Sequence, residues 1–147
     1  MTLLLKPNLL LIFFLFLIQH CLAQVLASSY KPKNKTEGLV IAKIHALPEV
    51  REFFRYVKKD KPDFIINPPA PTYDNCYAMQ IGIDYGDIFR TFFWLLIDPK
   101  TLQIYYYDFD DAGMQSISLL KWRYWRKRPE FHNPHKWVKG KLVVVHN

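Results

Sequence analysis

Apolar residues between positions 36 and 62 recur at helical spacing. A short first helix is predicted to begin near Thr36 and to reach Ala46. A second helix is predicted from Pro48 to the residues just before Pro62, because its apolar side chains fall at i, i+3, i+4 and i+7. The resulting apolar stripe consists of Val50, Phe53, Phe54 and Val57. We expect this stripe to face the core of the protein and not a partner.

The apolar pattern changes to that of β-strands after Pro71. Mostly apolar runs are separated by short polar turns, and links this short require antiparallel pairing. Residues Phe64–Asn67 would add a further strand at an edge. The three predicted strands are Cys76–Ile83, Ile88–Ile97 and Leu102–Asp108, with turns at Asp84–Asp87 and Asp98–Thr101.

Together these elements predict an α+β fold. An N-terminal helix pair packs on an antiparallel β-meander of three to four strands, followed by a basic C-terminal helix and tail. The C-terminal helix is predicted over Ser118–Lys127, with Ser116 or Ser118 as its N-cap. Trp122 and Trp125 share one face of this helix, so we expect them to dock on the sheet.

Aromatic side chains are more numerous in the predicted strands than one buried sheet face requires. Because strand residues alternate between the two faces, both faces must carry aromatic rings. Either the C-terminal segment covers the second face, or this face is an exposed binding surface. The aromatic residues concerned are Phe89, Phe92, Phe93, Trp94, Tyr105, Tyr106 and Tyr107.

The first 23 residues have the layout of a secretory signal. Lys6 is their only charge, an unbroken apolar run covers Leu9–Ile18, and Cys21-Leu22-Ala23 precedes the expected cut. The apolar run is half of the roughly 20 residues that cross a bilayer, although an uncleaved anchor and a lipoprotein acylated on Cys21 are alternatives. We therefore expect a secreted or periplasmic chain that starts at Gln24 and has no transmembrane segment.

The rest of the chain suits one domain. We expect a flexible lead-in over residues 24–35, a single domain over 36–128 and a basic extension over 129–147. Asn34-Lys35-Thr36 is a glycosylation sequon, which matters only in a eukaryote. Cleavage leaves Cys76 as a single cysteine, so no intrachain disulfide can form. A buried thiol is expected there, with an intermolecular disulfide or a reactive thiol as alternatives.

The C-terminal segment carries the net charge. Residues 121–141 hold eight basic side chains and one acidic one, Glu130, which accounts for the whole formal charge of +7. Tryptophans lie among these basic residues, as in segments that bind membrane headgroups, acidic glycans or acidic proteins. A solvated helix face and tail is the alternative. Nucleic acid fits the charge but not the predicted compartment, so it is not expected as a partner.

Motifs for catalysis or cofactor binding are lacking in the sequence. Asp108, Asp110 and Asp111 do not have the spacing of a calcium loop, and we expect them to be solvated acids at a strand end. His132 and His135 resemble a metal-binding pair only by their number. The sequence therefore predicts no catalytic residue, no metal site and no cofactor.

Two segments resemble the helix-then-meander pattern of PepSY-like domains. They are Ile41–Val50 (IAKIHALPEV) and Tyr77–Asp108 (YAMQIGIDYGDIFRTFFWLLIDPKTLQIYYYD). The turn Asp98–Thr101 is similar to the Asp-x-x-Thr-Gly turn of these hairpins, with Leu102 in place of the glycine. The resemblance implies a small secreted or periplasmic α+β module that binds proteins or inhibits extracellular enzymes, without catalytic residues. A cystatin-like or NTF2-like curved sheet around a helix is the alternative fold.

Three hypotheses of function follow. The first is a secreted, non-enzymatic binding protein that inhibits, or shields against, an extracellular enzyme. The second is a binder of an anionic surface through the basic aromatic segment. The third is a small enzyme with a pocket under a curved sheet and with Asp84, Asp87 or a tyrosine as acid or base. The candidate binding residues are Arg123, Arg126, Lys127, Arg128, Trp122, Trp125, Phe92, Trp94 and Tyr106.

Overall fold

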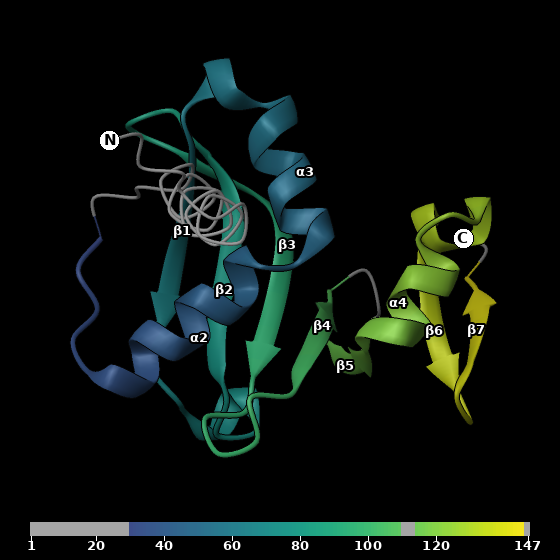
Figure 1. The fold of residues 1–147 in the computed structure, drawn as a ribbon. Helices are drawn as coiled ribbons and strands as arrows, with labels where there is room; N and C mark the ends of the chain where they lie inside the picture. Colours follow the sequence, from purple (N-terminus) through teal and green to yellow (C-terminus); the bar gives the residue numbers. More distant parts are fainter. Residues whose placement is uncertain (1–29, 110–113, 146–147) are drawn as a thin grey trace, which may run out of the picture. The chain divides into compact units, whose positions relative to one another are not determined.

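The computed structural model describes residues 30–109 and 114–145 (Figure 1). The predicted signal segment and most of the lead-in lie outside these residues. The described part of the chain combines helices with a five-stranded and a two-stranded antiparallel sheet, so the predicted α+β class is confirmed. Within these residues, no helix has the length and apolar character needed to cross a membrane.

Two consecutive helices precede the sheet: α2 spans Lys35–His45 and α3 spans Pro48–Tyr56. The side chain of Asn34 caps α2 by accepting a hydrogen bond from the backbone N–H of Glu37. Pro48 begins α3, where its missing N–H costs no helical hydrogen bond. Three positions of the predicted stripe are buried in the core, namely Val50, Phe53 and Val57.

The main sheet is a simple antiparallel meander with the strand order β1-β2-β3-β4-β5. It has one strand more than the three to four expected, because β5 was not predicted. Asp98 accepts hydrogen bonds from the backbone of Lys100 and Thr101, as its predicted turn requires, and Leu102 follows with a positive φ of 56°. The strands are β1 Pro62–Asn67, β2 Tyr77–Asp84, β3 Phe89–Ile97, β4 Ile104–Asp108 and β5 Gln115–Ser118. Short 3-10 turns lie at η1 Lys58–Asp60 and η2 Pro71–Tyr73.

One face of the sheet packs against the helices. Met79, Leu95, Tyr106 and Ile117 are paired in register across β2 to β5, so they point to the same side, and all four are buried. Phe93 of β3 contacts Phe53 of α3 with ring centroids 5.4 Å apart and Trp122 of the C-terminal helix at 5.7 Å. The C-terminal helix therefore lies on the same face as α3, and it does not cover the second face as one interpretation of the sequence proposed.

The second face of the sheet has its own small apolar cluster. Cys76, Ala78 and Leu96 are buried there, and three tyrosines pack against them. Trp94 meets Phe109 with ring centroids 4.7 Å apart, and neighbouring rings meet mostly edge to face. The tyrosines are Tyr73, which comes from η2, together with Tyr105 and Tyr107 of β4. These rings pack on one another and are half-buried, apart from Phe109, which is 37% exposed.

The chain ends in a compact set of short elements that we call the basic lobe, residues 119–144. It contains α4 Leu119–Trp125, η3 Pro129–His132, β6 His135–Val138 and β7 Lys141–Val144. Ser118 caps α4, as one of the two predicted N-caps. Lys139 and Gly140 both have positive φ, which is the backbone of a type I′ hairpin turn. The described part of the expected basic extension, residues 129–145, thus contains a 3-10 turn and a β-hairpin (Figure 1).

Candidate functional site

Two of the predicted binding residues, Trp122 and Tyr106, belong to the core. Their rings are stacked with centroids 4.8 Å apart and an interplanar angle of 8°. Trp122 is only 3% exposed, and the guanidinium of Arg126 lies 4.6 Å from its ring centroid. This stack fixes α4 on the sheet and leaves neither ring free to meet a ligand.

Arg123 is occupied by an ion pair that joins α4 to α3. Its Nε and Nη2 donate to the two carboxylate oxygens of Glu49 at 2.6 and 3.1 Å. The Arg123 hydrogen bond lowers the pKa of Glu49, and the same bond raises the pKa of Arg123. The planar fork of this arginine is therefore used inside the molecule.

Arg128 is also engaged at the surface of the basic lobe. Its Nη2 donates to the Tyr124 hydroxyl at 2.6 Å, and its guanidinium lies 4.2 Å from the Tyr124 ring centroid. It also lies 5.5 Å from the ring of Trp125, which in turn contacts Trp137. Lys127 is exposed beside them. The arginines of the lobe thus contact aromatic rings and a carboxylate, whereas four of its lysines are exposed, namely Lys127, Lys136, Lys139 and Lys141.

A buried polar contact attaches the hairpin to the sheet. Asp108, at the end of β4, is 0% exposed, and its Oδ2 accepts hydrogen bonds from His135 Nε2 and Trp137 Nε1, both at 2.9 Å. The Nδ1 of His135 lies 2.8 Å from the carbonyl oxygen of Asn133. Because a carbonyl oxygen only accepts hydrogen bonds, His135 Nδ1 must carry a hydrogen. The hydrogen bond between His135 Nε2 and Asp108 Oδ2 requires a second hydrogen, carried either by Nε2 or by the carboxyl group. His135 and Asp108 therefore form an ion pair or its proton-transferred equivalent.

The expectation of a solvated Asp108 is wrong. Asp108 is enclosed because β6 folds over the end of β4 and supplies both of its hydrogen-bond donors. His132 instead meets the carbonyl of Arg126 at 3.0 Å. Across the described residues, no cluster of three or more His, Cys, Asp or Glu side chains could hold a metal ion. Asp110 and Asp111 lie outside these residues.

The hairpin has two distinct faces, because its residues alternate in direction along each strand. His135 and Trp137 point inward, where the Lys121 ammonium lies 3.7 Å from the Trp137 ring centroid. Burial lowers the pKa of Lys121. The outward face consists of two cross-strand pairs, Lys136 with Val143 and Val138 with Lys141, and all four residues are exposed.

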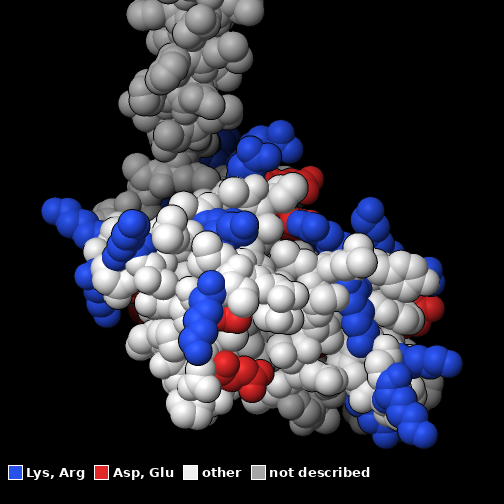
Figure 2. Space-filling model, turned by 60° about the horizontal axis from the view of Figure 1, so that its bottom comes forward, with Lys and Arg blue, Asp and Glu red and all other residues white. Residues whose placement is uncertain are grey.

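Several Lys and Arg side chains lie on the basic lobe, and others are spread over the rest of the same face (Figure 2). The elements of the lobe lie on the right of Figure 1, and the same side of Figure 2 shows several Lys and Arg side chains with little acidic surface between them. Residues 135–144, the hairpin itself, contain no acidic residue in the sequence. Three exposed lysines lie on it, Lys136, Lys139 and Lys141.

The two remaining predicted binding residues lie elsewhere. Phe92 is the extra residue of a β-bulge opposite the Ile81–Gly82 step, and it contacts Phe53 of α3 with ring centroids 5.1 Å apart. Trp94 belongs to the aromatic cluster of the second face. The nine residues predicted from the sequence therefore do not form one site.

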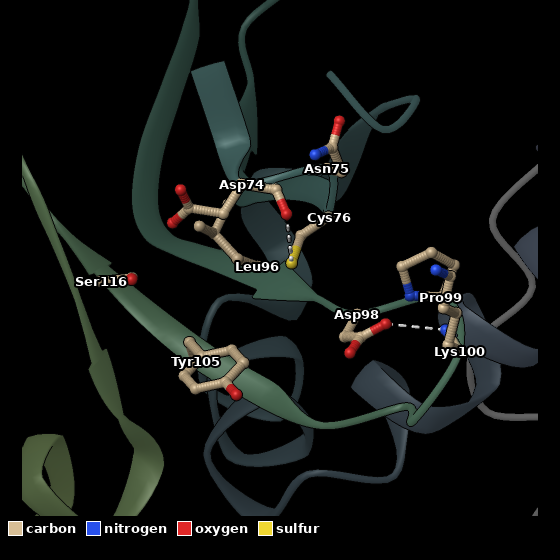
Figure 3. Close-up of a pocket in the computed structure, with 9 residues that line it drawn as sticks. All are labelled: Asp74, Asn75, Cys76, Leu96, Asp98, Pro99, Lys100, Tyr105 and Ser116. Atoms are coloured by element: carbon tan, nitrogen blue, oxygen red, sulfur yellow. Dashed lines mark hydrogen bonds between the residues drawn. The ribbon is translucent and has the colours of Figure 1, made fainter. Parts of the chain in front are cut away.

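A shallow hollow of about 480 Å³ opens on the second face of the sheet (Figure 3). Cys76 lies inside it, and its Sγ is 3.8 Å from the carbonyl oxygen of Asp74. Both carboxylate oxygens of Asp98 are used by its own turn, through Thr101 Oγ1 and the backbone N–H groups. The lining residues are Asp74, Asn75, Cys76, Leu96, Asp98, Pro99, Lys100, Tyr105 and Ser116.

Two ionisable groups in this hollow have shifted pKa values. Burial raises the pKa of the Cys76 thiol, with Asp98 and Asp74 adding to the effect, so the reactive thiolate is disfavoured. Hydrogen bonds from Lys100 and Thr101 lower the pKa of Asp98, which holds it as a carboxylate. Asp84, named in the enzyme hypothesis, caps the β2–β3 turn by accepting from the Gly86 N–H and is not among the lining residues.

Comparison with known proteins gives no relative from which a function could be inferred. The resemblance to PepSY-like domains stays a prediction. No family model, no curated protein and no solved structure matches this sequence.

Proposed function

We propose that this chain is a non-enzymatic binding protein that works outside the cytoplasm and holds an anionic partner through the basic lobe. The location rests on the signal-like residues 1–23, with cleavage near Ala23. The binding role rests on the hairpin, whose three exposed lysines have no acidic neighbour within the hairpin.

The observation that carries the proposal is the attachment of the hairpin to the domain. Asp108 fixes β6 by two hydrogen bonds from inside the fold, so the lysines are held in place and do not belong to a loose tail. A charged surface that is already ordered loses less conformational entropy on binding. It also concentrates positive potential, which speeds the encounter with an anionic partner.

Binding rather than catalysis is further supported by the hollow of the second face. Its thiol is held away from the thiolate form, and the carboxylate of Asp98 is occupied by its own turn. If the anionic partner is an acidic extracellular enzyme, the protein would act by inhibiting that enzyme or by shielding against it.

The test uses the mature chain on an immobilised polyanion such as dextran sulfate. Wild-type protein should be retained at low salt and released as ionic strength rises, because screening weakens exposed charge pairs. The triple variant Lys136→Gln, Lys139→Gln, Lys141→Gln should elute at clearly lower salt.

The matched control removes the same charge from exposed lysines of the helical region. It carries Lys43→Gln, Lys58→Gln and Lys59→Gln. If retention depends on the hairpin, this control should elute close to wild type. Equal loss of retention in both variants would mean that net charge alone is responsible, and the proposal would be rejected.

A further inference from the structure

The outward face of the hairpin alternates charge with apolar surface. In register, Lys136 lies opposite Val143 and Val138 lies opposite Lys141, so each valine has a lysine as its cross-strand neighbour. Val138 and Val143 are 43% and 41% exposed. A partner that interacts by charge alone leaves these valines in water, whereas a partner with an anionic rim and an apolar layer beneath it buries them.

The type of cation also indicates the partner. Arg123 uses its bidentate fork on Glu49, and Arg126 and Arg128 lie over aromatic rings, whereas the cations on the outward face of the hairpin are lysines. Lysine acts as a compact point charge without directional demand. A set of lysines suits a fluid layer of headgroups better than the fixed sulfate or carboxylate pattern of one macromolecule.

We propose that the outward face of the β6–β7 hairpin docks on an anionic lipid surface, with Val138 and Val143 entering the headgroup region and the lysines pairing with lipid phosphates. This proposal rests on the proposed function and names its partner. The type I′ turn places Lys139 at the tip of the same hairpin, where it adds a third positive charge. The buried pair of Asp108 and His135 holds the hairpin in place from its other face.

The experiment measures binding of the mature chain to phosphatidylcholine vesicles with and without phosphatidylglycerol. Binding should require the anionic lipid and should weaken at high salt. Each lysine near an anionic membrane contributes roughly 1 kcal/mol, a factor of about 5, so removal of all three should weaken vesicle binding by about 100-fold. A variant with arginine at all three positions keeps the charge and should bind.

A second variant separates lipid from other polyanions. Val138→Ser with Val143→Ser removes apolar surface without changing charge, so it should weaken vesicle binding several-fold and leave dextran sulfate retention unchanged. Leu39→Ser with Ile65→Ser is its control, because these exposed apolar residues lie on α2 and β1. Retention on dextran sulfate together with no preference for anionic vesicles overturns the lipid proposal and leaves the proposed function standing. If the triple lysine variant keeps both dextran sulfate retention and vesicle binding, the lipid proposal and the proposed function are both overturned.

Discussion

The substitution Asp108→Ala tests whether one buried carboxylate holds the hairpin to the domain. It removes the common acceptor of two donors, the buried His135 Nε2 and the part-buried Trp137 Nε1. These two hydrogen bonds join β6 to the end of β4. The hairpin should therefore open more readily, while the five-stranded sheet stays folded.

The expected cost follows from the groups left behind. Each buried donor without an acceptor costs about 1–3 kcal/mol. Breaking a buried ion pair by removing one partner costs about 3–5 kcal/mol. Asp108 Oδ1 is itself buried without a hydrogen-bond partner among the described residues, so its removal relieves some of that burial. We therefore expect about 3 kcal/mol, near the lower end of the range for ion pairs.

Hydrogen exchange of the backbone amides of residues 135–144 is the appropriate assay. Opening of the hairpin alone should expose these amides, and about 3 kcal/mol corresponds to a loss of protection of about 100-fold. Amides of β2 and β3 should keep most of their protection. Exposed Asp87→Ala, in the β2–β3 turn, is the control and should leave both regions unchanged.

The double variant Asp108→Ala, His135→Phe completes the test. Since the imidazole has lost its carboxylate in the single variant, its removal should add little, and the two effects should be far from additive. Additive effects, or hairpin protection that does not change in Asp108→Ala, would refute the role given to this pair.

Three further predictions concern the core, a surface ion pair and a turn. Burial lowers the pKa of His45 below 6.5, and nearby Asp63 opposes this effect. The free energy of unfolding should therefore fall as pH falls below about 6.5, because the unfolded chain takes up the proton more readily. In His45→Phe, the free energies of unfolding in urea at about pH 7 and about pH 5 should differ less than in the wild type. The Glu49–Arg123 pair lowers the pKa of Glu49, so its contribution is present above about pH 4.5 and is lost as pH falls further. A double-mutant cycle with glutamine at each position should give a coupling of about 1 kcal/mol, modest because the Arg123 side chain is 41% exposed. Leu102→Gly should raise the free energy of unfolding by up to about 1 kcal/mol in urea titration, because Leu102 has a left-handed φ of 56°, and a decrease would contradict the strain inferred there.

The helices and the first strands were predictable because their signals are local. The spacing of Val50, Phe53 and Val57 determines which side of α3 is buried, and neighbouring residues alone carry that information. The Asp98 turn likewise contains its own hydrogen-bond acceptor. Strand β5 was missed because Gln115–Ser118 is short and mostly polar, and its pairing with β4 stabilises it rather than its own composition.

The site was harder to predict because its key contact joins distant positions. Asp108 and His135 are 27 residues apart, and nothing near Asp108 in the sequence marks it as buried. The hairpin itself had a usable signal, since Lys139-Gly140 lies between two alternating segments, as in a two-residue turn. Recognition of that turn would have placed His135 and Trp137 on one face and indicated that residues 135–144 form a hairpin and not a tail.

The buried thiol makes the chain a convenient carrier for a single chemical label. Cys76 is 7% exposed, and its raised pKa keeps it in the slowly reacting thiol form, while the only other cysteine lies in the segment expected to be removed. A cysteine introduced at the hairpin tip by Lys139→Cys would be solvent-exposed and would react with a maleimide dye far faster than Cys76. A fluorophore at that one position would report directly whether the tip enters a lipid layer, without removal of the native cysteine.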